Sequence, residues 1–332
     1  MRFGPLPLAQ AAGAILAHSH ETPGGVLRKG HVLTPADLSA LAQAGAAEVT
    51  VAALDPGDVA EDAAAVRLAG ALVPDPEAAG LELTPPVNGR VNLRATRFGI
   101  LGIDAERVLA LNRIDPAITL ATLPPHARVT PGALVGTAKI ITYAVPEAAL
   151  ARAEAAGRGA LRVHAVVHRD AALVMTVVPG QAESLGAKGR RSTAGRLRGL
   201  GLALADTREV AHEVGALAEV LGEVAGDIVL ILTGSATSDM GDVAPEAVRR
   251  AGGQVARFGI PVDPGNLLFH GDLGGRPVIG LPGCARSPAL NGADWVLERI
   301  ACGRIPTAED IAAMGVGGLL KESPMRGQPR EG

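Results

Sequence analysis

Five consecutive aliphatic residues, Ile228–Leu232, restrict the fold of the second half of this chain more than any other feature. Such a run is typical of a strand buried on both faces, as the strands of parallel sheets are. It leads at once into Thr233-Gly234-Ser235, and a helix is predicted at Ala244–Ala251. Ligands bind outside the carboxyl ends of such strands, so we expect a site in the loop after Leu232.

Strand and helix patterns alternate around this run. In the helix predicted at residues 207–224, apolar residues recur at steps of three and four, and Asp206 and Glu209 form the expected capping pair. The alternation predicts an α/β fold with these segments: strands Leu161–Val167, Leu173–Val178, Leu202–Ala205 and Ile228–Leu232, and helices near Ser192–Arg198, at Thr207–Val224 and at Ala244–Ala251.

The first half is patterned differently. Residues 7–20 carry a short helical pattern, and Thr34 and Pro35 are expected to begin a helix at Asp37–Ala44. A strand at Glu48–Ala53 and a helix at about Ala60–Ala71 complete an α+β region, residues 1–75. Residues 76–150 form a mostly β module with predicted strands at Arg90–Thr96, Ile100–Ile103, Ile118–Thr122 and Leu134–Ile141. We expect a linking helix at Glu147–Ala156, an α/β domain at 151–305 and a linker-like tail at 306–332.

Composition narrows the function classes. A length of 332 residues allows two or three domains. The formal net charge of -3 provides no overall basic field for nucleic acid or an anionic membrane, and no apolar run is long enough to span one. Two cysteines, Cys284 and Cys302, cannot form a disulfide framework, and they suit a reducing cytoplasm. We therefore expect a cytoplasmic protein.

The loop after the Ile228–Leu232 strand supplies hydroxyls, carboxylates and backbone amides before a helix. It includes Ser235, Thr237, Ser238, Asp239 and Asp242. Such a loop can hold a phosphate and a polar ring. The alternative is an ordinary strand–turn–helix connection with Asp242 or Ala244 near the N-cap.

A second group of residues lies at Ile260–Asn266 and Val278–Pro288. Both segments are predicted to be strands that end in Pro-Gly turns, and Arg286 adds a planar fork suited to phosphate. Ser287 can cap a helix or donate a hydrogen bond. The alternative is a pair of tight connections with Arg286 as a solvated surface charge.

Together, these segments resemble the molybdopterin-binding family of molybdenum cofactor biosynthesis. Asp227–Glu246 resembles the family's strand, T-G-G loop and D-V-T-P-E helix start, and Ile260–Pro288 is similar to its P-G-K-P and L-P-G-N-P segments. Cys284–Ser287 and Asn291–Leu297 look like the branch that often carries a cytidylyltransferase domain behind this one. More distantly, the chain is similar to molybdopterin molybdenumtransferases. The resemblance implies a three-layer α/β/α domain.

The resemblance also implies the site residues. Asp242 would match the family's loop carboxylate, which orients pterin or Mg²⁺ and would be the catalytic residue of an active enzyme. Asp206 keeps a ligand role as an alternative to helix capping. The residues expected to bind molybdopterin or molybdenum cofactor are Thr233, Gly234, Ser235, Thr237, Asp242, Pro264, Gly265, Pro282, Gly283, Arg286 and Ser287.

Three departures from the family bear on catalysis. The second loop glycine is Ser235, the T-G-D-E turn is replaced by residues 178–183, and the N-P of L-P-G-N-P is Cys284-Ala285. A missing glycine restricts the approach of backbone to phosphate, and the lost carboxylate removes a metal or nucleotide contact unless Glu183 substitutes. We therefore expect a protein that binds the cofactor and presents it to a nucleotidyltransferase or a molybdoenzyme.

Two alternatives remain open. One is an active molybdenumtransferase that inserts molybdate into adenylylated molybdopterin with Mg²⁺, and the other is a ligand-free interaction module. Molybdenumtransferases are dimers and adenylyltransferases trimers, which leaves a homo-oligomer open. Cys284 is interpreted as a small turn residue rather than a nucleophile, and the histidines are too scattered for structural zinc. The basic residues Lys188, Arg190, Arg191, Arg196 and Arg198 are interpreted as a solvated face or as the rim of the pocket.

Overall fold

The computed structural model describes residues 1–180 and 182–318, and the chain divides into two compact units. Unit 1 comprises residues 1–97 and 101–163, and unit 2 comprises residues 98–100 and 164–332. The sequence placed domain boundaries at 75, 150 and 305 instead. The boundary at 150 differs because α5 (Glu147–Gly157), predicted to link two domains, buries Leu150 and Ala153 in the core of unit 1.

The first 57 residues form small sheets around one helix. The three-stranded sheet has the order β1-β5-β2, and a cluster of buried residues that includes Leu16, Leu33 and Leu41 fills its core. The helical pattern predicted at residues 7–20 is wrong, since strands and a single 3-10 turn occupy it. The elements are β1 (Arg2–Pro7), η1 (Leu8–Gln10), β2 (Ile15–Leu16), β3 (His20–Thr22), β4 (Gly25–Leu27), α1 (Pro35–Gln43) and β5 (Glu48–Ala53).

Helix α1 begins where the sequence predicts. Thr34 is its N-cap and Pro35 its first residue, and the Thr34 side chain accepts a hydrogen bond from the Asp37 amide. The Asp37 carboxylate accepts bonds from Thr34 and from His31, which together lower the pKa of Asp37 to about 2. This capping box satisfies amide groups that the helix itself leaves without partners.

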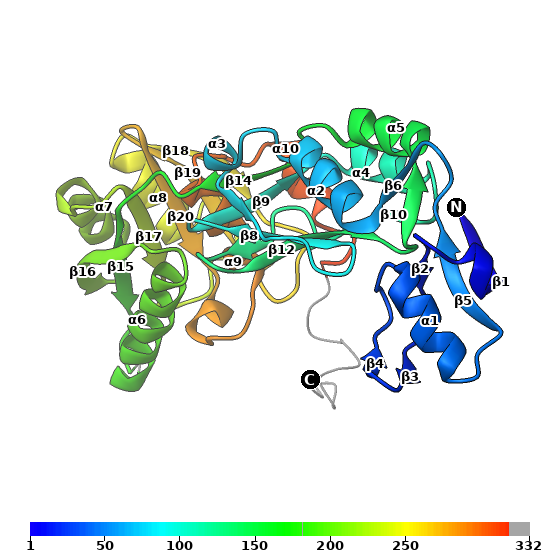
Figure 1. Ribbon diagram of the computed structural model, residues 1–332. Helices are drawn as coiled ribbons and strands as arrows, with labels where there is room; N and C mark the ends of the chain where they lie inside the picture. Colours follow the sequence, from blue (N-terminus) through cyan, green and yellow to red (C-terminus); the bar gives the residue numbers. More distant parts are fainter. Residues whose placement is uncertain (181, 319–332) are drawn as a thin grey trace. The chain divides into compact units, whose positions relative to one another are not determined.

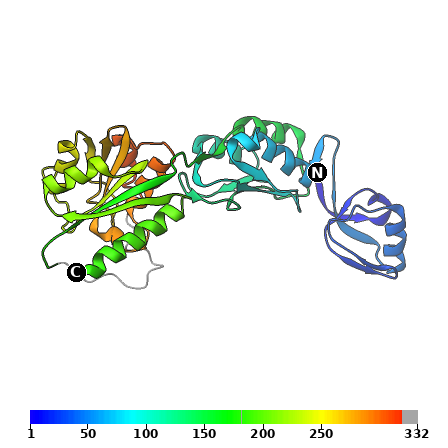
Figure 2. The ribbon, with the colours of Figure 1, turned by 90° about the vertical axis from the view of Figure 1, so that its left-hand side faces the viewer.

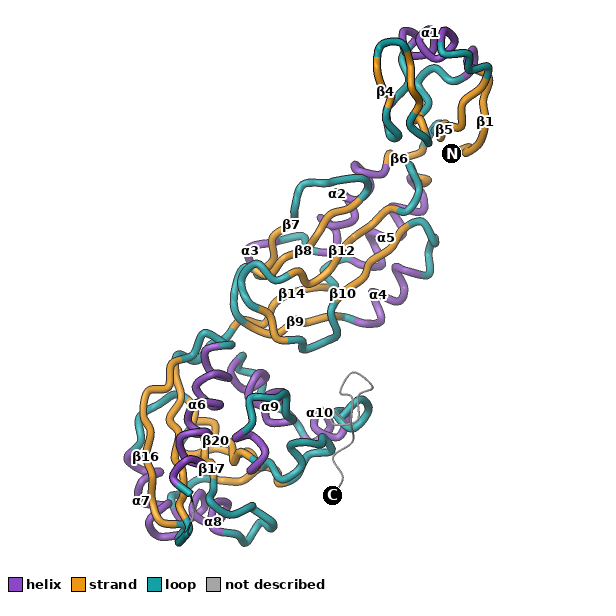
Figure 3. Tube along the Cα trace, turned by 90° about the horizontal axis from the view of Figure 1, so that it is seen from below, coloured by secondary structure: helices purple, strands orange, loops and turns teal. Residues whose placement is uncertain are grey.

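The rest of unit 1 packs three helices against short sheets (Figure 3). The largest sheet has the order β10-β12-β8-β7, and α2, α4 and α5 contribute to its core. The elements are β6 (Asp58–Ala60), α2 (Glu61–Leu72), α3 (Pro76–Ala79), β7 (Leu81–Leu83), β8 (Arg90–Ala95), β9 (Gly99–Ile103), α4 (Ala105–Asn112), β10 (Ile118–Thr122), β11 (Arg128–Val129), β12 (Leu134–Ile140), β13 (Ala144–Pro146), α5 and β14 (Leu161–Ala165).

Unit 2 is an α/β domain built on a six-stranded sheet of order β16-β15-β17-β20-β19-β18 (Figure 1). The first four strands are parallel, and β19 and β18 are antiparallel to their neighbours. The elements are β15 (Asp170–Val177), α6 (Glu183–Arg198), β16 (Ala203–Ala211), α7 (Val214–Glu223), β17 (Ile228–Leu232), α8 (Val243–Arg250), β18 (Gln254–Phe258), β19 (Phe269–Leu273), β20 (Arg276–Leu281), η2 (Gly283–Arg286), α9 (Gly292–Ala301) and α10 (Ala308–Ala313).

Helices cover both faces of this sheet, which makes three layers (Figure 2). Residues of α6, α9 and α10 pack on one face, and residues of α7 and α8 pack on the other. Strand β17 is buried along its whole length, as its aliphatic sequence predicts. Within the described residues, no helix combines the length and apolar character needed to cross a membrane.

The strand predicted at Leu161–Val167 is confirmed as β14, although it pairs with β9 outside the six-stranded sheet. Three other sequence predictions for this half of the chain are wrong. The helix predicted at 207–224 is strand β16 followed by α7, so Asp206 and Glu209 are strand residues that pair with Arg208 and Arg190 instead of capping a helix. Residues 260–266 are a loop with an isolated bridge rather than a strand.

The third concerns the predicted tail. Part of it is α10, which buries Ile311 in the core of unit 2. The remainder, 319–332, and Gln181 of the turn at 178–183 lie outside the described residues.

Strand β19 buries a histidine side chain. His270 is 2% exposed, and among residues 1–180 and 182–318 its Nδ1 atom finds no hydrogen-bond partner. Burial lowers the pKa of His270, and nearby Arg257 lowers it further. The native state therefore binds this proton less tightly than the unfolded chain, in which histidine has a pKa of ~6.5. The free energy of unfolding is therefore unaffected by His270 above that pH, and it decreases as the pH falls below it, because the unfolded chain then gains the proton first.

We expect His270→Leu to reduce the loss of stability between neutral pH and about pH 5, because the replacement cannot bind the proton. Urea denaturation at a series of pH values measures this, and His18→Leu, at an exposed site, is the matched control. A pH profile of His270→Leu that parallels the native one would show that His270 does not set this dependence.

Candidate binding site at the carboxyl edge of the unit 2 sheet

Strands β15, β17 and β20 are neighbours and parallel, so their carboxyl ends lie at one edge of the sheet. The loop that follows β17 contains Thr233 to Asp242, and the loop that follows β20 contains Pro282 to Ser287. All the site residues predicted from the sequence except Pro264 and Gly265 therefore occupy two adjacent connections at the edge where parallel sheets bind ligands.

The loop after β17 begins with buried hydroxyls and continues with free amides. The Gly234 amide donates to Thr176 Oγ1 at 2.9 Å, and the hydroxyls of Thr233 and Thr237, both buried, are 3.5 Å apart. Among the described residues, no acceptor pairs with the backbone N–H groups of Ser235, Ala236 or Thr237. Consecutive free amides in a turn can bind an anion.

Asp242 stabilises its own loop. One carboxylate oxygen accepts from the Val243 amide at 2.7 Å, and the other accepts from the Ser238 amide at 2.9 Å. Asp242 is thus the N-cap of α8, as the alternative interpretation of the sequence had it. Both oxygens already accept hydrogen bonds from the loop, which leaves less of the carboxylate for a pterin or a cation.

Arg286 is the unusual charge of this edge. Its Nη2 donates to the Thr233 carbonyl at 2.7 Å, and its buried Nε has no partner in the part of the chain that the structure describes. No carboxylate among the described residues pairs with it. Burial lowers the pKa of the Arg286 guanidinium, since the charged form loses hydration that no counter-ion replaces. A bound anion would supply both the missing charge and the missing acceptor.

A second arginine holds the loop that carries Arg286. Arg196, on α6, is 6% exposed and donates from Nε to Asp294 at 2.7 Å. Its other nitrogens donate to the carbonyls of Ala285, Ser287 and Ala289 at 2.7–3.1 Å. Sequence reasoning placed Arg196 on a solvated face or at a pocket rim. The signal it missed is the helical row of Gly189, Ser192 and Thr193 before it, whose small side chains leave room for a packed loop.

The other basic residues of α6 lie on the surface. Lys188, Arg190, Arg191 and Arg198 are exposed, and Arg190 pairs with Glu209 at 3.0 Å. Glu183 is the exposed first residue of the same helix.

Asp206 lies in the fourth position of β16, well before the carboxyl end of that strand, and it binds Arg208. The structure therefore offers no support for a ligand role of Asp206.

The loop at 260–268 reaches the same region through α9. The Gly292 amide donates to the Pro264 carbonyl at 2.8 Å. A Cβ on Gly265, whose φ is +133°, would lie 2.7 Å from the Gly292 nitrogen, so this position requires glycine. Asn291, the N-cap of α9, donates to Cys284 Sγ at 3.1 Å. Pro264 and Gly265 are thereby connected to the loop after β20.

Sequence reasoning missed one polar residue at this edge. His212 directly follows β16, and its Nδ1 is 2.8 Å from Thr176 Oγ1. Since that oxygen accepts from the Gly234 amide, the Thr176 hydroxyl proton is free to be donated to Nδ1. His212 is thus tied to the start of the loop after β17. The sequence signal was hidden by the incorrect helix at 207–224, which placed His212 inside a helix.

These contacts favour anion binding over acid–base chemistry. The two neighbouring loops carry several donors: Arg286, the free amides, and the hydroxyls of Thr233 and Thr237. Asp239 and Asp242 accept bonds from amides of their own loop. Within the described residues, no three His, Cys, Asp or Glu side chains form a group that could hold a metal ion.

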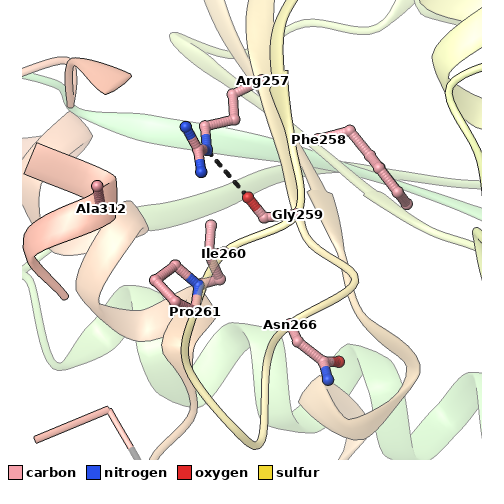
Figure 4. Close-up of a pocket in the computed structure, with 7 residues that line it drawn as sticks. All are labelled: Arg257, Phe258, Gly259, Ile260, Pro261, Asn266 and Ala312. Carbon is pink, nitrogen blue, oxygen red and sulfur yellow. Dashed lines mark hydrogen bonds between the residues drawn. The ribbon is translucent and has the colours of Figure 1, made fainter. Parts of the chain in front are cut away.

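Two hollows lie elsewhere. One, of about 530 Å³, is in unit 2 beside the edge strand β18 and is lined by residues 257–261, Asn266 and Ala312 (Figure 4). There Arg257 donates to the Gly259 carbonyl at 3.0 Å, and the wall is largely apolar. The other, of about 250 Å³, is in unit 1. Neither contains a residue of the candidate site.

Comparison with known proteins gives a limited result. A family model described as a domain of unknown function (DUF8806) matches residues 5–53. No curated protein sequence matches the chain. Among solved structures, the chain is similar to the molybdopterin biosynthesis protein MoeA from Pyrococcus horikoshii, with 16% identity and a TM-score of 0.31, over 92% of this chain and 76% of that one.

A second similar structure is the molybdopterin biosynthesis enzyme MoaB from Thermus thermophilus. It shows 18% identity and a TM-score of 0.27, over 41% of this chain and 98% of that one. At these identities and TM-scores, neither likeness assigns a ligand or an activity to this chain.

Proposed function

We propose that unit 2 binds molybdopterin or a form of the molybdenum cofactor at the carboxyl edge of its sheet. The loop motifs at Asp227–Glu246 and Ile260–Pro288 support the choice of ligand, because they resemble those of molybdopterin-binding proteins. The observation that carries the proposal is Arg286, a half-buried cation with no counter-ion and a buried Nε without a partner among the described residues. The phosphate of molybdopterin is an anion that such a fork suits.

The residues present fit the two ends of this ligand. Arg286 and the free amides of Ser235 to Thr237 would hold the phosphate. The hydroxyls of Thr233, Ser235, Thr237 and Ser287 can donate and accept, as the pterin ring requires. Gly234, Pro264, Gly265, Pro282 and Gly283 would shape the wall, where side chains are small or absent. His212 adds a further polar group at the same edge.

Binding and presentation are favoured over turnover. An active molybdenumtransferase would use Asp242 to orient the pterin or Mg²⁺, but both carboxylate oxygens of Asp242 accept amide hydrogen bonds within the loop. We therefore propose that the protein presents the bound pterin to a nucleotidyltransferase or a molybdoenzyme. Asp242 would serve the site indirectly, by holding residues 238–243 in place.

Titration of the full chain with purified molybdopterin under anaerobic conditions, followed by pterin fluorescence, tests this proposal. We expect Arg286→Met to weaken binding by about 10–100-fold, since charge-assisted hydrogen bonds contribute roughly 1.5–3 kcal/mol each. Arg250→Met, at an exposed site on α8, is the matched control and should bind like the native chain. Absence of binding by the native chain would favour an interaction module without a ligand.

A second arm of the experiment separates carrier from enzyme. The chain is incubated with adenylylated molybdopterin, molybdate and Mg²⁺, and AMP release is measured. The proposal predicts bound pterin without AMP. AMP release that disappears in Asp242→Ala, while the variant stays folded, would replace the carrier with a molybdenumtransferase.

A further inference from the structure

A polar pocket of about 250 Å³ lies within unit 1, in residues that the proposed function does not use. Its volume is below the roughly 300–1,000 Å³ typical of pockets for drug-sized ligands, so it suits a smaller molecule. The lining comes from a turn before α1, the first residue of α2, the turn before β8 and the end of β12 with the residues after it. It consists of Lys29, Gly30, Glu61, Asn88, Lys139, Ile141, Thr142 and Tyr143.

Lysine is rare in this chain, and two lysines meet in this pocket. Of the 31 lysine and arginine residues, only Lys29, Lys139, Lys188 and Lys321 are lysines. A protein that uses arginine nearly everywhere else places two compact ammonium groups here. Lysine binds phosphate as a point charge, whereas arginine prefers the planar, two-pronged contact. The only tyrosine of the chain, Tyr143, lines the same pocket.

Neither of these lysines has a direct ion pair within the described residues, although Glu61 of the same pocket interacts with both at longer range. The Lys139 ammonium donates to the Asn88 carbonyl, and among the described residues neither Lys29 nor Lys139 forms an ion pair with a carboxylate. Two ammonium groups facing one small cavity repel each other and favour an anion between them. A phosphate monoester carries about −1.5 to −2 charges at neutral pH, and each of the two lysines offers it a positive charge.

Glu61 gives the pocket a second kind of contact. Burial raises the pKa of Glu61, and the charges of Lys139 and Lys29 oppose this only in part. Its Oε2 lies close to Gly89, where an added Cβ would be 2.7 Å away. No hydrogen-bond donor among the described residues satisfies the Glu61 carboxyl group. A ligand hydroxyl could donate to it.

We propose that unit 1 binds a small phosphorylated polyol, with the phosphate at Lys29 and Lys139 and the hydroxyl groups at Glu61 and Asn88. This site is separate in residues and in ligand chemistry from the one at Arg286, and it does not depend on the proposed function. The two lysines favour a ligand that is anionic at one end. Glu61 favours a neutral, hydroxylated other end, because its carboxyl group would repel a second anion.

Calorimetric titration of the full chain with glycerol 3-phosphate tests the site, with inorganic phosphate and glycerol as comparison probes. We work in the Arg286→Met background, so that heat from the unit 2 site does not contribute. We expect glycerol 3-phosphate to bind at least tenfold more tightly than inorganic phosphate, and glycerol alone not to bind. In this background, Lys139→Met should weaken glycerol 3-phosphate binding at least tenfold, and Lys188→Met, at an exposed site on α6, should leave it unchanged.

Two further variants keep the result interpretable. Lys29→Met lies in an exposed turn, where it should not disturb folding, and it should also weaken binding at least tenfold. Glu61→Ala should remove the preference for glycerol 3-phosphate over inorganic phosphate while phosphate still binds. No heat with either phosphate probe, or native affinity in both Lys29→Met and Lys139→Met, would overturn the proposal. Equal affinity for the two phosphate probes would overturn the polyol part.

Discussion

Arg196→Met is expected to destabilise unit 2 by about 3–5 kcal/mol, the cost of leaving one partner of a buried ion pair without the other. Arg196 and Asp294 are each 6% exposed at the side chain and are 2.7 Å apart. The substitution also removes the donors that hold the carbonyls of Ala285, Ser287 and Ala289. We therefore expect the loop after β20, with Arg286, to lose its conformation along with the stability. Urea denaturation and pterin titration measure the two losses.

Three controls interpret this result. Arg208→Met breaks an exposed ion pair with Asp206 and should have little effect, because solvent screens such pairs. Arg196→Lys keeps the charge but cannot reproduce all four contacts, so an intermediate loss is expected. Arg196→Met/Asp294→Leu should be more stable than Arg196→Met alone, since no buried charge remains. A small effect of Arg196→Met would contradict the buried pair.

Phe269→Ala is expected to cost about 3–5 kcal/mol, because it leaves a cavity in the core of unit 2. Phe269 is 1% exposed and stands directly opposite Gly280 in the antiparallel pair of β19 and β20. A Cβ on Gly280 would lie 1.9 Å from the Phe269 ring, so the ring covers the glycine. Gly280→Ala should therefore also destabilise, by about 1–3 kcal/mol, since the ring has no room to move.

The double variant tests this interlocking arrangement. In Phe269→Ala/Gly280→Val the new side chain enters space that the ring has left, so the cost should be smaller than the sum of the single costs. Urea midpoints of Phe269→Ala, Gly280→Val and the double variant measure the coupling. Leu273→Ala, a buried position on the same strand without a glycine opposite, is the control that should not be rescued by Gly280→Val. Strictly additive costs would show that ring and glycine do not depend on each other.

Local signals predicted much of the fold. Strands β5, β10 and β17 have the predicted bounds, and α1 begins with the predicted cap. These segments are defined by their own residues: a run of aliphatic side chains, or a hydroxyl placed before a proline. Strand β16 was predicted only at its start, as Leu202–Ala205. Its remainder was missed because the strand lies at the sheet edge with few buried side chains, and its Val210 continued the helical spacing of α7.

The candidate site was likewise predicted only in part from the sequence. The positions of Thr233, Gly234 and Arg286 at the carboxyl edge follow from the strands before them, and the sequence predicted them together. What Arg196 and His212 do depends on residues 98 and 36 positions away, which no local pattern reveals. Arg196 is buried by Asp294, and His212 is held by Thr176, so both roles required the tertiary structure. Asp242 caps its own helix, a local role that the sequence had offered as the alternative.

The strip Phe98–Ile100 has a practical consequence for anyone who divides this protein into fragments. It belongs to unit 2, although the residues on both sides of it belong to unit 1. The Phe98 carbonyl accepts from the Val166 amide at 3.1 Å, and the Phe98 ring lies against Gly201, where an added Cβ would be 2.9 Å away. A fragment that begins at His164 would expose surface that this strip normally covers. No single cleavage separates the two units with both intact.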